Sequence, residues 1–279
     1  MSNNESVETK VLPKISRDRG DQTYRIRTLV LIGVLLALLA AQVIKTPAIL
    51  TSFATIYGYL VSTILSIASI AFMACGVTFV IVTGNNDLST SSTLMLTVIM
   101  SCTLTGQFFE RFGDAGASII ALVVPLFIGA LCGLLNGILI GPLRLNSFVT
   151  TLGTQFAIIG INILYNGGLT AQAKPGLKVF SFVGRGKILG ISFPILLLLF
   201  TYLVFGFILH KTTFGRKIYA VGTNREAARF SGINPSKIIM TAYVIAGLMA
   251  GLAGIFMASY TQTGDMLLGA GKEFNAIIA

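Results

Sequence analysis

The sequence predicts an all-α membrane protein, a bundle of about seven transmembrane helices joined by polar links. Hydrophobic residues make up 54% of the chain and charged residues only 11%, whereas about 25% of the residues in a typical soluble domain are charged. The charges are also segregated, because Asp87 is the only charged residue between Thr46 and Phe109. Uncharged apolar runs of about 18 residues or more are candidate transmembrane helices. Several of them in one chain indicate a multi-pass membrane protein.

The apolar runs define the expected spans in order. Residues 1–27 are polar, and we expect them to form a flexible cytoplasmic tail before the first span, Thr28–Ile44. The stretch Ser52–Thr83 is too long for one upright helix, so we expect the part before about Thr63 to be interfacial or steeply tilted. The second span is then Ile64–Val82. Later spans are expected at Ser92–Leu104, Ser118–Ile140, Phe148–Tyr165, Ile191–Leu209 and Ile238–Tyr260, with a short loop at Gln107–Ala115.

Glycines recur along one face of the fourth expected span. Every fourth residue from Gly129 to Gly141 is glycine, and residues four apart share a helix face. Each glycine costs roughly 1 kcal/mol of helix propensity relative to alanine, and close contact with a neighbouring helix is the usual compensation. The seventh expected span carries a similar face with Gly247, Gly251 and Gly254. We therefore expect these faces to serve helix packing rather than to line a pathway.

Asp87 is the one acidic residue within the apolar regions, and it lies in the polar run Gly84–Ser92. A charged residue at the bilayer centre costs about 2.5–3.5 kcal/mol on insertion scales, and irregular backbone is tolerated there where protein or a water-filled cavity borders it. Two interpretations stay open. The run is either a cytoplasmic turn in which Asp87 caps the third span, or a discontinuous element beside a transport pathway together with Asn85 and Asn86.

The fifth expected span carries a polar face. Thr151, Thr154, Gln155 and Asn162 fall on one side of a helix at these spacings, and a polar face on a membrane helix points to the bundle interior. Such a face could form hydrogen bonds with neighbouring helices or could contact an uncharged solute. The sequence favours neither role over the other.

The longest polar insert between two apolar runs is Thr212–Lys237, which is basic and contains the short helix-forming run Arg225–Gly232. Cytoplasmic links of membrane proteins carry an excess of Lys and Arg, and their distribution here favours a cytoplasmic N-terminus with this insert in the cytosol. The loop Asn166–Gly190 opposes that orientation with four basic residues on the other side. Two spans within Ser52–Thr83 would invert the orientation of everything that follows.

Several stretches together resemble one transporter family. The run NREAARFSGIN, Asn224–Asn234, resembles the coupling loop of permease subunits of ATP-binding-cassette importers. FGRKIYAVGTNREAARFSGIN followed by AYVIAGLMAGLAGIFMAS resembles the ribose, xylose and galactose branch of these permeases. VTGNNDLSTSS, and SFVTTLGT with the later Gly167–Gly168, resemble two further stretches of that branch, so the resemblance covers most of the chain beyond about Thr51. The chain departs from the branch at Asn85, Asn86 and Ser91, which leaves the exact solute open.

The resemblance implies that residues 28–279 form a transmembrane permease domain, the translocation pathway for a sugar or sugar-like solute. It also implies a bacterial plasma-membrane location and partners: a cytoplasmic ATP-binding subunit docked on residues 210–237, an extracytoplasmic solute-binding protein and a second permease subunit, in a homo- or heterodimer. The family continues beyond the stretch EFNAIIA, so Ala279 is expected to be a truncated end. The residues expected to couple to the ATP-binding subunit are Glu226, Ala227, Ala228 and Gly232. The candidate pathway residues are Asn85, Asn86, Asp87, Phe148, Thr151, Thr154, Gln155 and Asn162.

Other functions fit the sequence less well. We expect no cofactor, metal or nucleic acid, because the basic residues lie in links between apolar runs and the three cysteines lie within such runs without a CxxC pair. Neither Gly186-Lys187 nor Gly271-Lys272 has the glycine five residues earlier that a phosphate-binding P-loop needs. We therefore expect ATP hydrolysis in a separate subunit. The alternatives are a permease for nucleosides or branched-chain amino acids, an ATP-independent secondary transporter or channel, and a membrane scaffold.

Overall fold

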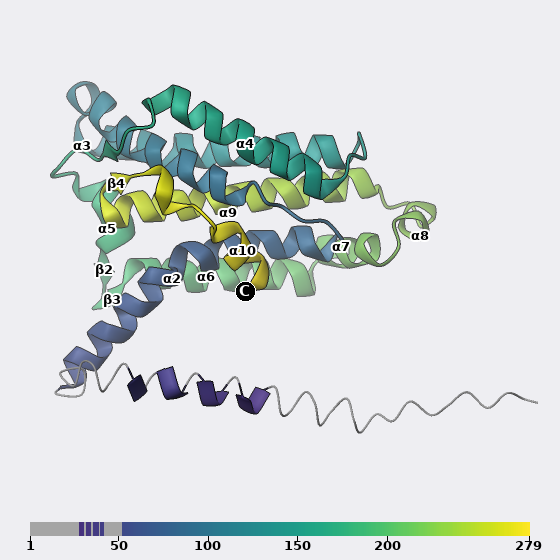
Figure 1. Cartoon of the computed structure of the whole chain (residues 1–279), viewed down its shortest axis with the longest axis horizontal. Helices are drawn as coiled ribbons and strands as arrows, with labels where there is room; N and C mark the ends of the chain where they lie inside the picture. Colours follow the sequence, from purple (N-terminus) through teal and green to yellow (C-terminus); the bar gives the residue numbers. More distant parts are fainter. Residues whose placement is uncertain (1–27, 31, 35, 39, 42–51) are drawn as a thin grey trace, which may run out of the picture. The chain divides into compact units, whose positions relative to one another are not determined.

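The computed structural model describes residues 28–30, 32–34, 36–38, 40–41 and 52–279. The expected tail, residues 1–27, and the end of the first expected span lie outside this part of the chain. Within the described residues, five helices are long and apolar enough to cross a membrane (Figure 1). They are α2 (Phe53–Val82), α3 (Thr90–Ile140), α4 (Ser147–Asn166), α6 (Phe193–Lys211) and α9 (Pro235–Thr261). The predicted all-α, multi-pass membrane fold is confirmed, and the number of seven spans stays a prediction.

Short elements connect the long helices. The helices are α5 (Lys178–Arg185), α7 (Thr213–Thr223), α8 (Arg225–Phe230), the 3₁₀ turn η2 (Met266–Leu268) and α10 (Lys272–Ile278). Four two-residue strands form two antiparallel pairs, β1 (Ala171–Gln172) with β4 (Thr263–Gly264) and β2 (Lys187–Ile188) with β3 (Ile191–Ser192). The chain divides near Leu60 into two compact units, and the following paragraphs concern the second, Val61–Ala279.

Two helix boundaries differ from the predicted ones. The link expected at Gln107–Ala115 is shorter than predicted, because α3 consists of two helices that meet at Gly113, where φ is +65°. The chain reverses direction there, since Asn136 in the second helix donates to the Ser89 hydroxyl at the start of the first at 2.7 Å. The run QFFERF before Gly113 consists of residues that a helix accommodates, so the break is confined to one glycine, which adopts positive φ without the penalty that a Cβ would bring. The stretch Ser52–Thr83 forms one continuous helix, α2, from Phe53 to Val82, and the interfacial or tilted course expected for its first part stays a prediction.

The predicted glycine faces pack α3 against α9, as expected. The pairing is antiparallel: Gly129 lies against Gly247 and Gly251, and further along α3 Gly137 lies against Met240. A Cβ on Gly137 would lie 2.8 Å from the Met240 Cα, and one on Gly133 would overlap the Tyr243 carbonyl. The two backbones are therefore in direct contact over the second half of α3, an arrangement that small residues permit between membrane helices.

The last residues fold back along α3 instead of leaving the bundle. Gly264 packs on the backbone of Ile99, and Gly269 packs on Ser91 and Met95, nearer the start of α3. The β1–β4 pair anchors this return, because Ala173 N–H also donates to the Gln262 carbonyl at 3.0 Å. As a result α10 lies against α3 and brings a charged segment into the bundle.

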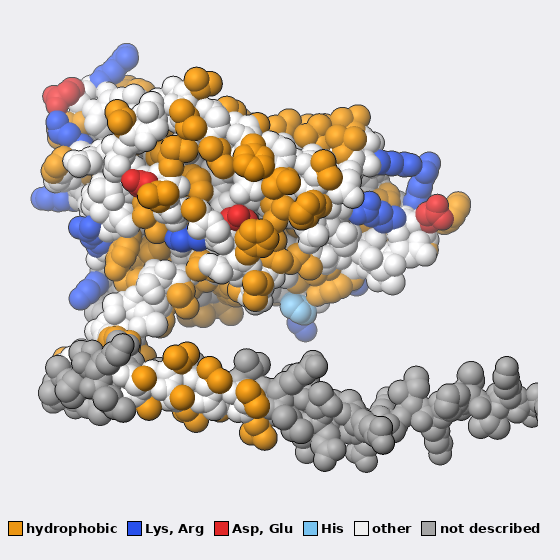
Figure 2. Space-filling model, viewed as in Figure 1, with side chains coloured by type: hydrophobic (Ala, Val, Ile, Leu, Met, Phe, Trp, Pro, Cys, Tyr) orange, Lys and Arg blue, Asp and Glu red, His pale blue; other side chains and the backbone are white. Residues whose placement is uncertain are grey.

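The two ends of this unit differ in charge, and many hydrophobic side chains lie on the face between them that Figure 2 shows. At one end, which we call the basic end, the Ser236 hydroxyl donates to the Gly141 carbonyl at 3.1 Å and joins the α3–α4 link to the start of α9. At the opposite end, Lys174 pairs with Glu110 at 3.2 Å and Lys178 N–H donates to Asp114. The basic end carries Arg144, Lys211, Arg216, Lys217, Arg225, Arg229 and Lys237, with Glu226 as its exposed acid.

The contact between α3 and α9 is testable by adding one methyl group. We expect Gly133→Ala to lower the free energy of unfolding by about 1–3 kcal/mol, because the new Cβ would overlap the Tyr243 carbonyl. Gly160→Ala on α4 is the matched control, since a Cβ there meets nothing within 4 Å, and it should be neutral or stabilising by up to about 1 kcal/mol. Thermal unfolding of the detergent-solubilised protein measures both. Equal midpoints for the two variants would contradict the close packing.

Candidate functional site

The predicted helix within residues 225–232 is present as α8. Asn224 caps it, because its side-chain oxygen accepts hydrogen bonds from the backbone N–H groups of Glu226 at 3.0 Å and Ala227 at 2.9 Å, as is usual for an N-cap asparagine. Gly232 follows the helix at φ +78°, a conformation that side chains other than glycine rarely adopt. The chain then turns into α9, whose N-cap is Asn234.

The four predicted coupling residues differ in exposure. Glu226, Ala227 and Gly232 are exposed, whereas Ala228 is buried in the chain's own core with Ile218 of α7. Ala228 therefore holds α8 on the bundle and does not offer contact surface. Sequence reasoning missed Phe230, whose side chain is 90% exposed on the same helix.

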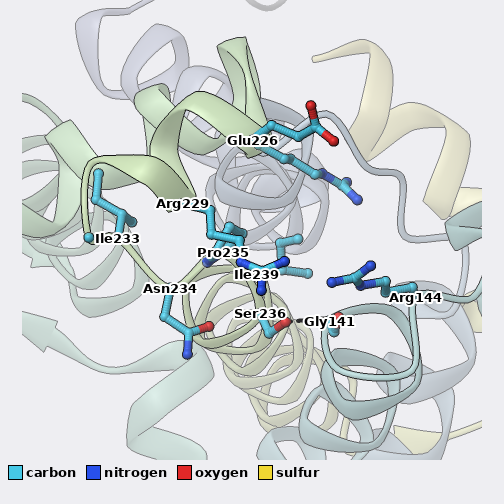
Figure 3. Close-up of a pocket in the computed structure, with 11 residues that line it drawn as sticks. Gly141, Arg144, Glu226, Arg229, Ile233, Asn234, Pro235, Ser236 and Ile239 are labelled. Carbon is cyan, nitrogen blue, oxygen red and sulfur yellow. Dashed lines mark hydrogen bonds between the residues drawn. The ribbon is translucent and has the colours of Figure 1, made fainter.

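A cavity of about 580 Å³ lies beside α8 (Figure 3). Arg225, Glu226 and Arg229 line it from α8, and Arg144 lines it from the link between α3 and α4. Within the part of the chain that the structure describes, none of these four side chains takes part in an ion pair. Gly141, Gly232, Ile233, Asn234, Pro235, Ser236 and Ile239 complete the lining. We call this space the arginine cavity.

Asp87 is buried in a non-helical turn, residues 83–89, between α2 and α3. Its Oδ1 accepts hydrogen bonds from the Ser89 backbone N–H at 2.9 Å and from the Ser89 hydroxyl at 2.7 Å. Burial raises the pKa of the carboxyl to about 6, and the hydrogen bonds from Ser89 act in the opposite direction. The turn therefore is buried and non-helical, and Asp87 binds the N-cap residue of α3. Both interpretations open from the sequence stay predictions.

Neighbouring helices hold this buried turn through uncharged groups. Leu88 N–H donates to the Thr151 hydroxyl of α4 at 3.2 Å, and the Asn136 amide of α3 donates to the Ser89 hydroxyl at 2.7 Å. The Tyr243 hydroxyl of α9 donates to the Asn86 carbonyl at 2.7 Å.

The buried turn also contacts α8. An Arg225 guanidinium nitrogen donates to Asn85 Oδ1 at 2.8 Å, and the Asn85 amide in turn donates to the Thr83 hydroxyl at 2.8 Å. Arg225 and Asn85 are 140 residues apart in the chain. One arginine thus belongs both to the arginine cavity and to the buried turn.

The polar face of α4 points into the bundle, as predicted, with Thr151 and Asn162 fully buried. The Gln155 amide lies 3.4 Å from the Ser91 hydroxyl and 3.4 Å from Glu273 Oε1. Glu273 is itself buried, and its Oε2 has no hydrogen-bond partner among the described residues. The same holds for both amide atoms of Asn162.

The structure groups the predicted pathway residues only in part. Asn85, Asn86, Asp87 and Thr151 meet in or beside the buried turn. The Thr154 hydroxyl donates to the Thr151 carbonyl of its own helix, and Phe148 is 52% exposed at the start of α4. Sequence reasoning missed Asn136, Arg144, Arg225, Tyr243 and Glu273. In the described ranges, no group of three or more His, Cys, Asp or Glu residues could hold a metal ion.

Comparisons with known proteins place this architecture in a family. The chain is 32% identical to the ribose import permease of Escherichia coli strain K12 over 211 residues, which cover 75% of this chain and 64% of that protein. It is 33% identical to the L-arabinose transporter permease of Azospirillum brasilense over 265 residues, which cover 95% of this chain and 74% of the relative. It is 29% identical to the fructose import permease of Rhizobium meliloti over 194 residues, 67% of this chain and 52% of that one.

The chain thus spans less than two thirds of the Escherichia coli relative's length. No solved structure matches it. A family model described as "branched-chain amino acid transport system / permease component" matches residues 59–279. Because that match takes in the buried turn, α4, the arginine cavity and the whole of α8 and α9, the chain belongs to this family of transport-system permease components.

Proposed function

We propose that this chain is the membrane-spanning subunit of an ATP-driven importer and forms the translocation pathway for a sugar or sugar-like solute. The observation that carries the proposal is the combination of an exposed coupling helix at the basic end with a direct hydrogen bond from that helix to the buried turn. The names of the relatives, which are import permeases for ribose, arabinose and fructose, support a sugar as the solute.

The charge distribution supports a plasma-membrane orientation with the basic end and the N-terminus in the cytosol. The basic end carries seven Lys and Arg residues and one exposed acid, whereas the opposite end carries Glu110 and Asp114 together with its basic residues. Positive charge in short links is retained on the cytoplasmic side. The loop Asn166–Gly190, whose basic residues oppose this orientation, lies at the opposite end, which we call the mixed end. There Glu110 pairs with Lys174, and the Asp114 carboxylate accepts a hydrogen bond from the Lys178 backbone.

In this arrangement a cytoplasmic ATP-binding subunit grips α8 through Glu226, Ala227 and the exposed Phe230, while Gly232 provides the sharp exit from the helix. Ala228 contributes by fixing α8 on the core, so that force on the helix reaches the bundle. Closure of the partner subunits would then move the pathway between outward- and inward-facing states. The partner, and not this chain, hydrolyses ATP.

The pathway itself is proposed to pass the buried turn and the polar face of α4, where unpartnered polar atoms of Asn162 and Glu273 face the interior. Uncharged hydrogen-bonding groups suit a solute that presents hydroxyl groups. A second permease subunit would complete the pathway, and an extracytoplasmic solute-binding protein would deliver the solute at the mixed end.

Uptake into membrane vesicles that contain the assembled transporter tests the proposal. We expect ATP-dependent uptake of a radiolabelled pentose or hexose that unlabelled sugars reduce and that a nucleoside or a branched-chain amino acid does not. The family description keeps branched-chain amino acids as the second candidate class. Uptake driven by an ion gradient without ATP would refute the ATP-driven mechanism.

Reversing the charge at Glu226 tests the coupling helix. Glu226→Lys should abolish or reduce uptake at least about tenfold, because it removes the one exposed acid from α8 without touching its cap or core. Glu110→Lys is the control: it makes the same charge change on a side chain that is 81% exposed at the mixed end. The control should retain ATP-driven uptake. Similar losses in the two variants would argue against a docking role for α8.

Labelling of introduced cysteines tests the orientation. In a variant that lacks Cys75, Cys102 and Cys132, a cysteine at Ser231 should react with a membrane-impermeant thiol reagent only in inverted vesicles, and one at Glu110 only in intact cells. Both positions are exposed. Labelling of the Ser231 variant from outside the cell would refute the proposed orientation and the docking of a cytoplasmic partner.

A further inference from the structure

We propose that the arginine cavity receives an acidic segment of the ATP-binding subunit, and that Arg225 carries this contact to the buried turn by exchanging Asn85 for a carboxylate of the partner. The inference rests on the proposed function, because it names the chemistry of the partner surface that docks there. It assigns a role to Arg144, which belongs to no motif in the sequence and lies about 80 residues away from α8 in the chain.

The first argument is charge. Arg144, Arg225 and Arg229 border one cavity, and none of them has an ion-pair partner within the residues that the structure describes. Glu226 is the only acid in the lining, and Figure 3 shows its carboxylate turned away from Arg144 and Ser236. Like charges held around one hollow repel one another, so an anion is the complementary occupant.

The second argument is the form of the site. Guanidinium groups present planar pairs of donors that match carboxylates, and Arg–carboxylate pairs are often bidentate. A cavity of about 580 Å³ has room for more than one side chain, so a short acidic segment fits better than a single carboxylate. Because two of the three arginines lie on α8 itself, a partner that grips α8 also covers the cavity.

An anionic lipid headgroup is the competing occupant, since basic pockets near the cytoplasmic ends of membrane helices can bind such groups. A lipid also needs apolar surface for its acyl chains next to the charged pocket. Only Ile233, Pro235 and Ile239 supply apolar side chains to this lining, and Ile239 is buried in the core. The lining therefore favours a protein carboxylate, and lipid binding is an outcome that the experiment can detect.

The third argument is the double role of Arg225. Its guanidinium donates to the neutral Asn85 amide oxygen at 2.8 Å while it borders the cavity. A hydrogen bond to a carboxylate is roughly twice as strong as one to a neutral acceptor, so a docked acid would draw Arg225 away from Asn85. Release of Asn85 frees one end of the buried turn, which also contains Asp87. Docking of the partner would thereby change the contacts of this turn.

Charge reversal in the cavity tests the docking step. In nanodiscs made of neutral lipid, Arg144→Glu and Arg229→Glu should each weaken binding of the separately purified ATP-binding subunit by about tenfold or more. Arg216→Glu is the matched control, because it removes the same charge from an exposed position of α7 outside the cavity. It should weaken binding no more than about threefold. Arg144→Gln and Arg229→Gln repeat the test with neutral side chains in case the reversed charges prevent folding.

The transmission step needs a separate variant. Asn85→Ala should leave the affinity for the ATP-binding subunit within about threefold of the wild type and should lower the solute transported per ATP hydrolysed, because Arg225 no longer has the buried turn as its alternative partner. Unchanged stoichiometry in Asn85→Ala would overturn the role of Arg225 as the link.

The outcomes separate the inference from the proposed function. If the wild type binds the ATP-binding subunit and the cavity variants bind it as tightly as Arg216→Glu does, the cavity inference fails and the proposed function stands. If, in a second preparation that contains phosphatidylglycerol, the cavity variants lose this lipid in native mass spectrometry while their subunit affinity in neutral lipid is unchanged, the occupant is a lipid and the inference is wrong. If the wild type binds no ATP-binding subunit in any lipid, the proposed function itself fails.

Discussion

Direct backbone contact between α3 and α9 is the constraint on which the rest of this structure depends. The glycines from Gly129 to Gly141 on one helix and Gly247 with Gly251 on the other bring the two backbones into contact. Lipid supplies no hydrophobic force between membrane helices, so their association depends on close packing and interhelical polar contacts. The contact gives α9 a fixed position against the second half of α3. Its polar side chains can therefore form hydrogen bonds with groups at defined places in the bundle.

Two features of the site follow from that fixed position. Tyr243 reaches the Asn86 carbonyl only because α9 lies against α3 at Gly133. Ser236, at the start of α9, reaches the Gly141 carbonyl and so brings the α3–α4 link beside α8, which closes the arginine cavity. A seam of small residues thus determines where the buried turn and the cavity lie.

Local pattern was enough to predict most of the fold. Apolar run length indicated the long helices, glycine spacing indicated the α3–α9 packing, and the run Arg225–Gly232 indicated α8. Run length also indicated the two spans within α3 but overestimated the link between them, because charged residues near a membrane surface can stay helical up to the single non-helical residue Gly113. Periodicity also correctly turned Thr151 and Asn162 inward.

The site was predictable only where it lies within one segment. The hydrogen bond between Arg225 and Asn85 joins residues 140 positions apart, and nothing in either local sequence specifies the other. Glu273 sits in a stretch with little hydrophobic periodicity, and its place beside Gln155 results from the return of the chain along α3. In the sequence, Arg144 is an ordinary basic residue in a short link. Only the structure shows that it lines a cavity together with the start of α9.

The chemistry around the buried turn suits an element that moves. Its contacts to α3, α4 and α9 are hydrogen bonds between neutral groups, each with a net value of about 1 kcal/mol. A buried ion pair in the same place would cost about 3–5 kcal/mol to break, because it leaves a charge without a partner. The single carboxylate, Asp87, is bound by Ser89 of the same turn. Because Ser89 moves together with Asp87, these hydrogen bonds persist when the turn moves. The turn can therefore change its partners on α3, α4 and α9 without leaving the Asp87 carboxylate unbound.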